Sequence, residues 1–294
     1  MNLRTSLLAL GAALMLALPA QAATDWAAVG KALGKTGSVQ AGGVYRVGLP
    51  RSDLKVTLDG VQIKPALALG SWLAFRDMGD QAMVMGDLVL TQEEVNPVMK
   101  VLVQNGIEIS ALHNHLLRST PGTMYMHVDG HGDAVQLATA LHAALAQSGT
   151  PMGASAPPTA PAPLDLDTAK LDQALNAKGA ANGGVYQFNI PRAEPPKSDG
   201  MAIPPAMGSA IAINFQPTGG GKAAITGDFV LTAGEVNPVI RALRANGIEV
   251  TALHNHMLDD EPRLFFMHFW ANDDAQKLAQ GLRAALDHVA VARP

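Results

Sequence analysis

Two hydrophobic periods alternate along the chain. Residues 91–106, TQEEVNPVMKVLVQNG, place apolar side chains three and four positions apart and end in Asn-Gly, which predicts an amphipathic helix. Residues 107–117 and 123–128 are rich in apolar and β-branched side chains and are separated by RSTPG, which predicts two strands joined by a turn. Residues 133–147 return to helical spacing after an aspartate suited to an N-cap.

This order of elements occurs twice. At an offset of 141 residues the segment 86–116 falls on 227–257 with 20 identities in 31 positions. The register continues outside that window, because Gly-Gly-Val-Tyr at 42–45 falls on the same four residues at 183–186. Similarity of this extent indicates an internal duplication, so the two halves are expected to share one fold.

The remaining pattern sets the expected fold class. Short helices are predicted at 25–33 and 167–175, ahead of each repeat. The strands predicted next are 43–50, about 54–63, 67–76 and 82–90 in the first repeat, with counterparts such as 184–191 in the second. We therefore expect an α+β protein of two tandem homologous domains. Each would be a mostly antiparallel sheet with helices packed on one face, around a β-α-β-β-α core.

Composition indicates where these domains begin and end. Residues 1–22 combine a basic residue, an apolar run and a small-x-small site ending at Ala22, which is typical of a cleaved secretory signal peptide. Residues 151–165 are rich in alanine and proline, which is typical of an extended linker. The predicted domains are therefore a first repeat at 23–150 and a second at 166–294, in a periplasmic or secreted protein.

Charge and cysteine content exclude several functions. The net charge is −4, and the chain has no basic block, so a nucleic-acid partner is not expected. The chain has no cysteine, which excludes disulfides, a thiol nucleophile and an iron–sulfur cluster. After the signal, no apolar run approaches the roughly 20 residues of a membrane helix, so the mature chain is expected to lack an integral membrane segment. The partner classes that remain are a small molecule and a component of the cell envelope.

Each repeat carries the same three-histidine pattern, ALHNH followed by MH. Side chains two residues apart on a strand point to the same face, and a hairpin centred near residue 120 would place His127 opposite His113. Three imidazoles with an open fourth position suit zinc or copper. The predicted metal ligands are His113, His115 and His127 in one site and His254, His256 and His268 in a separate second site.

The alternative to metal binding is a structural role, in which these histidines form hydrogen bonds inside a half-buried sheet. A bulge in either hairpin would turn the third histidine to the other face and remove it from the site. Four methionines flank the histidines and are either core residues or soft ligands suited to copper. They are Met124, Met126, Met257 and Met267.

Several acidic residues are secondary candidates. Glu94 and Glu235 stand in T-x-x-E sequences typical of a helix capping box, and are weak candidates for a catalytic base. Asp87 and Asp228 occupy matched positions and would either form turns or support the histidines. Glu108 is expected on the face opposite the histidines if its strand is regular. Asp129, His131 and Asp133 follow the third histidine in the first repeat only and are either part of a site or solvated surface.

The long motifs resemble a known family. GDLVLTQEEVNPVMKVLVQNGIEISALHNH, GDFVLTAGEVNPVIRALRANGIEVTALHNHML and EPRLFFMHFWAND are similar to the LppY/LpqO family of bacterial envelope proteins, a domain of unknown function. The resemblance covers essentially the whole mature chain and implies an exported protein of two related halves, without an established reaction, substrate or cofactor. The name-giving members are lipoproteins anchored through a cysteine, which this chain lacks.

Two functions from different classes follow. The first is an exported metal-binding protein with a three-histidine site in each repeat, acting as a zinc- or copper-dependent hydrolase or as a metal carrier. The second is a non-enzymatic envelope module that binds a small ligand, glycan or protein between its halves, with structural histidines. A third, metal-free acid–base catalysis by histidine and Glu94, has the least support. Metal analysis of the purified protein separates the first function from the others.

Overall fold

The computed structural model describes residues 23–153, 163–198 and 200–292. The predicted signal peptide and the centre of the predicted linker lie outside these residues. The elements of the first half are α1 (Trp26–Leu33), β1 (Ser38–Gln40), η1 (Ala41–Gly43), β2 (Val44–Pro50), β3 (Thr57–Leu58), β4 (Val61–Gln62), α2 (Pro65–Ala68), β5 (Gly70–Asp77), β6 (Ala82–Thr91), α3 (Gln92–Gln104), β7 (Glu108–His113), β8 (Thr123–Gly132) and α4 (Ala134–Leu145).

The second half repeats this order with small changes. Its elements are α5 (Thr168–Leu175), β9 (Ala180–Asn182), β10 (Val185–Pro191), β11 (Lys197–Ser198), β12 (Met201–Ala202), η2 (Pro205–Met207), β13 (Ala210–Gly219), β14 (Lys222–Thr232), α6 (Ala233–Ala245), β15 (Glu249–His254), β16 (Asp260–Glu261), β17 (Leu264–Asp274) and α7 (Ala275–Leu286). No helix among the described residues is both long and apolar enough to span a membrane.

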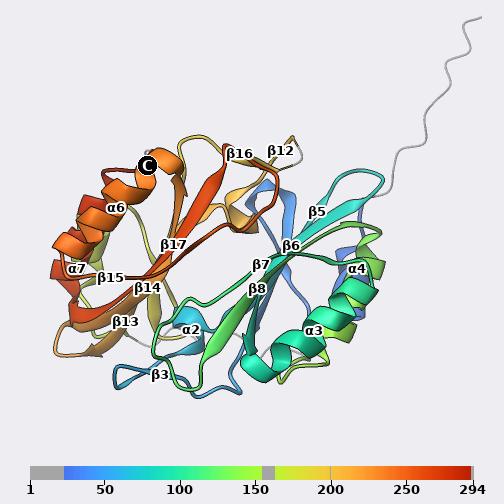
Figure 1. The fold of residues 1–294 in the computed structure, drawn as a ribbon, viewed down its shortest axis with the longest axis horizontal. Coiled ribbons are helices and arrows are strands. Elements are labelled where there is room, and N and C mark those ends of the chain that lie inside the picture. The colour runs from blue at the N-terminus through green and yellow to red at the C-terminus, as the bar shows by residue number, and fades with distance from the viewer. Residues whose placement is uncertain (1–22, 154–162, 199, 293–294) are drawn as a thin grey trace, which may run out of the picture.

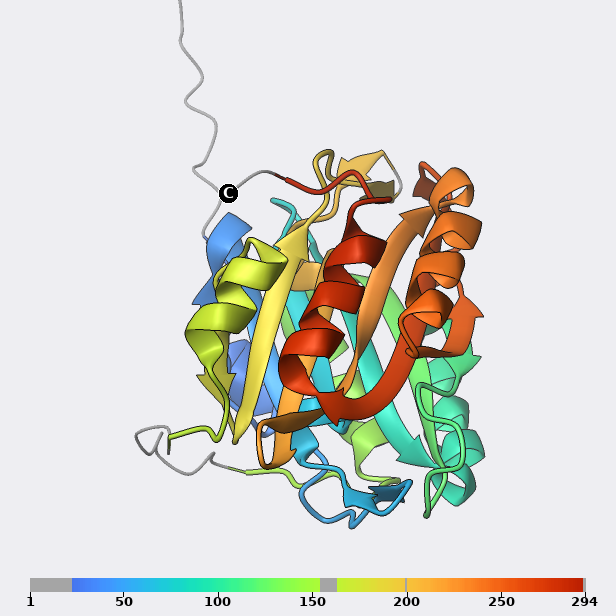
Figure 2. The same cartoon turned by 90° about the vertical axis from the view of Figure 1, so that its left-hand side faces the viewer.

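Each half forms one six-stranded antiparallel sheet, in the order β1-β2-β5-β6-β8-β7 and, in the second half, β9-β10-β13-β14-β17-β15. The long helices α3 and α4 cover one face of the first sheet and α6 and α7 cover one face of the second, and the other two faces are turned toward each other with the short helix α2 between them (Figure 1). The molecule therefore has four layers, helices, sheet, sheet and helices, and the helices of the second half lie in front of both sheets in Figure 2. The expected α+β class of two tandem domains is confirmed.

Alternation along the central strands assigns side chains to these layers. Leu88 on β6 and Met126 on β8 are buried in the core beneath α3 and α4. Asp87 and His127, one position away on the same strands, therefore point to the opposite face, between the two sheets. Tyr125 lies on that inner face and packs with residues of the second half. The inner face thus carries polar groups into the junction between the repeats.

The expected strands at 54–63 and 67–76 are only partly correct. The first contains two strands of two residues each, which pair with one another outside the main sheet. Residues 65–68 form the short helix α2 before β5 begins at Gly70. Asp59 and Gly60 have positive φ, so the chain turns back after two paired residues and cannot continue as one strand. The apolar pattern there belongs to a compact loop that packs against the second half.

The two halves exchange hydrogen bonds from matched positions. Arg46 on β2 donates to the carbonyl oxygen of Ala206 in the second half. Gln187 on β10 stands 141 positions later and donates to the carbonyl oxygen of Ala66 in the first half, at 2.8 Å. Ala66 and Ala206 themselves correspond in the alignment of the repeats. The junction therefore has approximate two-fold symmetry, with each half holding the other in the same way.

A second matched pair extends this symmetry. Gln216 is buried, donates from Nε2 to the carbonyl oxygen of Gln62 and accepts from the Lys64 amide, both at 2.8 Å. Arg76, at the corresponding position of the first half, donates to the carbonyl oxygen of Ala202 at 2.6 Å. Because these bonds join segments more than a hundred residues apart, the two sheets pack in one defined register.

Candidate metal centre

Paired strands place a carboxylate beside the third histidine in each half. Asp87 on β6 lies directly opposite His127 on β8, and Asp228 on β14 lies opposite His268 on β17. Directly opposed residues in an antiparallel pair share a face of the sheet, so each carboxylate points toward its histidine. Asp87 and Asp228 are therefore neighbours of the site and not turn residues.

The hairpin that carries the other two histidines has a different register from the expected one. His113 lies opposite Tyr125, and Ala111 lies opposite His127, so the predicted His113–His127 pairing is wrong by two residues. A shift of two residues keeps the side chains on the same face, so the three histidines still converge. The second half has the same pairing, with His254 opposite Phe266.

A bulge interrupts both hairpins, but it lies ahead of the histidines. The register shifts between Ile109 and Ala111 and again between Val250 and Ala252. The extra residue turns Glu108 onto the histidine face, contrary to the prediction for a regular strand, but its side chain is exposed. The histidines keep their face because the bulge precedes them.

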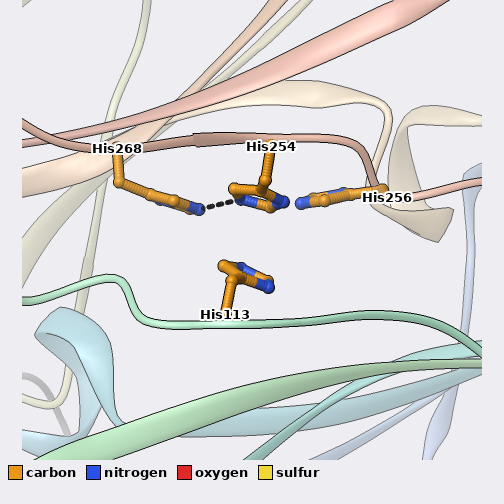
Figure 3. A group of neighbouring side chains, drawn as sticks. All are labelled: His113, His254, His256 and His268. Atoms are coloured by element: carbon orange, nitrogen blue, oxygen red, sulfur yellow. Dashed lines mark hydrogen bonds between the residues drawn. The ribbon is translucent and has the colours of Figure 1, made fainter.

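The six histidines form one cluster, where the sequence had indicated two separate sites. His113 of the first half stacks on His254 of the second with ring centroids 3.4 Å apart. The other two pairs also join the halves, His115 with His268 at 3.6 Å and His127 with His256 at 3.7 Å. Each half thus presents its three imidazoles as one layer, and Figure 3 shows the second layer with His113 across from His254.

Aromatic rings and backbone contacts hold these layers in place. Tyr125 stacks on His115 at 3.4 Å, and Phe266 stacks on His256 at 3.3 Å in the matching position. The bulge residues add a reciprocal contact, since the Thr251 hydroxyl donates to the carbonyl oxygen of His115 at 2.6 Å. Ser110 donates in the same way to the carbonyl oxygen of His256. The position of each layer therefore depends on the opposite half.

Within each layer the Nε2 atoms approach one carboxylate. In the first half, the Asp87 oxygens lie 3.8 Å from His115 Nε2 and 3.9 Å from His127 Nε2. In the second, the Asp228 oxygens lie 3.6 Å from His256 Nε2 and 3.9 Å from His268 Nε2. Ligands on one zinc ion, with bonds near 2.0–2.1 Å, are separated by about 3 to 4 Å. The spacing of these atoms therefore suits coordination of an ion between them.

The contact between His254 and His268 identifies where their lone pairs point. His268 Nδ1 lies 2.9 Å from the carbonyl oxygen of Gly227, and His254 Nδ1 lies 3.2 Å from that of Asn255. A carbonyl oxygen only accepts, so each Nδ1 carries the proton and each Nε2 is left with a lone pair. The two Nε2 atoms nevertheless lie 2.9 Å apart. A cation coordinated by both nitrogens relieves the repulsion between these lone pairs.

Protonation does not remove this repulsion easily. Burial lowers the pKa of His268 to about 3 and that of His254 to about 4. Burial likewise lowers the pKa of the other four histidines, and neighbouring histidines add to the effect. Near neutral pH all six imidazoles are therefore neutral, which is the form that binds a metal.

The two carboxylates are shifted in the opposite direction. Burial raises the pKa of Asp87 to about 8, and the positive charge of Arg46 opposes this shift. Burial raises the pKa of Asp228 well above its ordinary value, and the charge of Asp87 adds to it. A divalent cation beside these groups would favour their ionised form.

Several polar atoms of the cluster have no hydrogen-bond partner among the described residues. These buried atoms are Oδ1 of Asp87 and Asp228, Nδ1 of His113, and Nε2 of His127 and His256. Buried polar atoms in native proteins are nearly always paired, so a set of five at one place indicates a ligand site. Two groups have ligand atoms close enough to hold a metal ion: His113 with His115 and His127, and His113 with His254, His256 and His268.

Glu94 and Glu235 have structural contacts away from this cluster. Glu94 receives two hydrogen bonds from the buried Arg51, at 2.7 and 3.0 Å, and accepts from the amide of Thr91. Glu235 is bound in the same way by Arg192, at 2.8 and 3.2 Å. The capping boxes are confirmed, and both carboxylates are already engaged at the start of a helix.

The other flanking candidates divide into core and surface. Met126 and Met267 are fully buried on the helix face of their strands, whereas Met257 lies beside His256. Asp133 caps α4 by accepting from the amides of Val135 and Gln136. Met124 packs against the core of the first half, so Met257 is the one of the four flanking methionines that lies at the cluster.

Four residues of the site were missed by sequence reasoning, among them Tyr125, which stacks on His115. Arg46 brings a half-buried positive charge toward Asp87, and its guanidinium lies 4.2 Å from the ring centre of Trp72. Ser110 and Thr251 join the layers through their hydroxyls. Ser110 and Thr251 could have been found from the sequence, because both repeats place a hydroxyl residue three positions before the first histidine.

Comparisons with solved structures give only weak likeness. The chain is 11% identical to a trimeric bacterial microcompartment shell protein, PduB, with a TM-score of 0.23 over 86% of this chain and 90% of that one. It is also 11% identical to EtuB from Clostridium kluyveri, with a TM-score of 0.20 over 85% of this chain and 88% of that one. Such scores support no argument about this chain. A search of curated proteins gives no match.

A protein-family model matches both repeats. Its description is Domain of Unknown Function (DUF1259), and it covers residues 27–147 and 169–288. The expected membership of the LppY/LpqO family is wrong, because the family whose model matches is this one, while the expectation of two tandem copies is confirmed. The chain belongs to the DUF1259 family of unknown function and consists of two copies of its domain.

Proposed function

We propose that this chain is a metal-binding protein that holds zinc or copper in one composite centre at the junction of its two repeats. Each repeat would supply three imidazole nitrogens and one carboxylate oxygen, and so a place for one ion. The observation that carries the proposal is the 2.9 Å approach of the His254 and His268 Nε2 atoms, both left with lone pairs by their Nδ1 contacts. The proposed ligands are His113, His115, His127 and Asp87 in one layer and His254, His256, His268 and Asp228 in the other.

The donor set favours zinc or copper over harder ions. Imidazole nitrogen is a preferred ligand of both metals, whereas magnesium and calcium prefer oxygen. Hydrogen bonds from Nδ1 to backbone carbonyls, as in His268 with Gly227, are the usual support of a metal-bound histidine. One carboxylate beside three imidazoles also lowers the net charge of a bound dication.

Burial of the centre limits the size of the substrate that could reach it. His127, His256 and His268 are buried, whereas His113, His115 and His254 are half-buried. A polymer cannot reach ligands enclosed between two sheets, so hydrolysis of a large substrate is disfavoured. We therefore favour holding and delivering a metal ion, or chemistry on a small molecule, over action on a glycan or protein.

We also propose that this protein is exported from the cytoplasm. The predicted signal peptide at residues 1–22 and the lack of cysteine suit a periplasmic or secreted protein. Expression of the full chain in a Gram-negative host, followed by fractionation and N-terminal sequencing, tests this. A mature N-terminus near Ala23 in the periplasmic fraction supports export, and an uncleaved chain in the cytoplasm contradicts it.

Metal analysis tests the central claim. Protein purified without a histidine tag, stripped with a chelator and titrated with zinc or copper at neutral pH should bind up to two ions per chain. His254→Ala should lose tight binding, whereas His131→Ala, a half-exposed histidine outside the cluster, should bind as wild type. Failure of the wild-type protein to take up either metal would refute the proposal and leave the alternative, a non-enzymatic envelope module with structural histidines.

A further inference from the structure

The two ends of the histidine cluster differ, although the repeats that build them are related by approximate two-fold symmetry. The symmetry exchanges the His115–His268 pair with the His256–His127 pair. At the first end the central histidines lie close to their neighbours, with His113 Nε2 at 3.0 Å from His115 Nε2 and His254 Nε2 at 2.9 Å from His268 Nε2. The Nε2 atoms of both central rings therefore point toward the same end of the cluster, although each ring centre is about equally far from its two neighbours.

At the opposite end, His127 and His256 have buried Nε2 atoms without a hydrogen-bond partner among the described residues. These two histidines line a narrow cavity with free volume of about 10 Å³, the space of roughly one water molecule. Its wall also includes Ser110 and three methionines, Met85, Met207 and Met257. The cavity is thus apolar except where the imidazoles and the serine hydroxyl meet it.

The matched positions at the other end carry different side chains. Thr251 replaces Ser110 and adds one methyl group. Leu116 replaces Met257, and it is buried in a packed cluster with Leu67 and Trp270. Methionine adapts its shape to a small guest more readily than leucine does. The cavity wall at the His127–His256 end therefore has a smaller hydroxyl residue and a more flexible apolar side chain than the matched positions at the other end.

We propose that a water-sized lone-pair donor binds a metal ion of the composite centre at its His127–His256 end, inside this cavity. The inference rests on the proposed function, because the metal supplies the bond to the guest. The class of guest is a donor with a single heavy atom, such as water, hydroxide or fluoride, since the wall carries no formal charge and the volume excludes larger molecules. The opposite end takes no such guest.

Fluoride serves as the probe, with copper(II) loaded into the full chain. Fluoride bound to copper(II) splits the electron paramagnetic resonance signal through its fluorine nucleus, so a titration yields its dissociation constant without an activity assay. Ser110→Thr adds a methyl group to the cavity wall and keeps the hydroxyl that donates to His256, as Thr251 already does for His115. The matched control is Thr251→Ser, which keeps its hydroxyl at the opposite end.

The expected result is that wild type and Thr251→Ser bind fluoride with affinities within twofold of each other. Ser110→Thr should bind the same amount of copper and should bind fluoride with at least tenfold lower affinity. Equal fluoride affinity in both variants would overturn the inference, and so would loaded wild-type protein that shows no fluoride splitting. Copper content separates these failures from failure of the proposed function, in which no copper binds and the inference falls as well.

Discussion

His113 and His254 lie face to face at the centre of the cluster, with their ring centroids 3.4 Å apart, although they belong to different repeats. Neither repeat can form this contact alone. His113 also has ligand atoms within reach of both possible metal groups, one of which it shares with three histidines of the second repeat. The two three-histidine sets therefore act as one unit.

Stacking of the two central rings predicts coupled loss of metal. His113→Ala and His254→Ala should each weaken binding of both ions, on the order of 100-fold, because removal of either central ring changes the opposite layer as well. The double variant should lose less than the sum of the two single losses, as expected for residues in direct contact. Competition titrations with a chromophoric chelator measure these affinities. Loss of one ion with wild-type affinity for the other would show two independent sites.

Local sequence information was sufficient for the composition of each layer but not for their assembly. Strand parity placed His113, His115 and His127 on one face, and a register error of two residues did not change that face. The stacking of His115 on His268 depends on how two sheets pack, which no local pattern encodes. The duplication gave a reason to expect two similar sites, yet no reason to expect that they would meet.

The fold was predictable where the periodicity was long and failed where it was short. Helices with a cap and a stop signal, such as α3 between Thr91 and Asn105, begin and end where expected. The apolar stretch at 54–63 was wrongly given to a single strand, because a short apolar run does not reveal the positive-φ turn at Asp59 and Gly60. Contacts across the junction, and not local propensity, determine the conformation of that segment.

The metal-free protein should be most stable near pH 6 to 7. Histidine pKa values are lowered in the folded state, so below about 6.5 the unfolded chain binds more protons and stability falls as pH falls. The pKa of Asp87 is raised to about 8, so between about 4 and 8 the folded state holds a proton that the unfolded chain has lost. The contribution of Asp87 to stability therefore falls as pH rises. Above about pH 6.5 the histidines of the cluster no longer oppose this loss, so the stability of the metal-free protein declines.

Metal loading should remove the alkaline loss, because bound carboxylates are ionised in the folded state. Thermal melting of metal-free and zinc-loaded protein from about pH 4 to 9 checks both curves. The metal-free protein should show a maximum and the loaded protein a plateau above neutrality. A metal-free curve that keeps rising to pH 8 would contradict the buried, protonated state of Asp87.

Glu94→Gln should destabilise the fold and leave metal binding unchanged. Glu94 shares Arg51, whose side chain is 1% exposed, with Asp53, so loss of the Glu94 charge leaves Asp53 as the carboxylate that balances the buried guanidinium. The expected cost is about 1 to 3 kcal/mol in the free energy of unfolding, the range for hydrogen bonds to a charged group. Urea denaturation measures this cost, and Glu235→Gln should also destabilise the fold through Arg192.

The control for that change is Glu93→Gln, since Glu93 is exposed on the same first turn of α3. It should alter stability by no more than about 0.5 kcal/mol. If Glu94→Gln instead abolished metal-dependent chemistry while stability stayed at the wild-type level, its assignment as a structural residue would be wrong.

Gln216→Ala tests whether the two repeats unfold together. The buried Gln216 amide joins the halves through two hydrogen bonds, and its loss leaves the Gln62 carbonyl and the Lys64 amide without that partner. We expect a loss of about 1 to 3 kcal/mol, because both bonds are only partly buried and water can replace part of each. The matched change Arg76→Ala removes the corresponding bond to Ala202 at an exposed position and should cost less than about 1 kcal/mol.

Calorimetry and denaturant titration of wild type, Gln216→Ala and Arg76→Ala measure these differences. Because the histidine layers stack across the same junction, Gln216→Ala should also weaken zinc binding, by roughly tenfold for 1.4 kcal/mol of lost packing between the layers. A stable Gln216→Ala protein with wild-type zinc affinity would mean that the histidine stacks alone hold the repeats in register. Separate unfolding transitions for the two halves in the wild-type protein would contradict the single unit that the shared cluster implies.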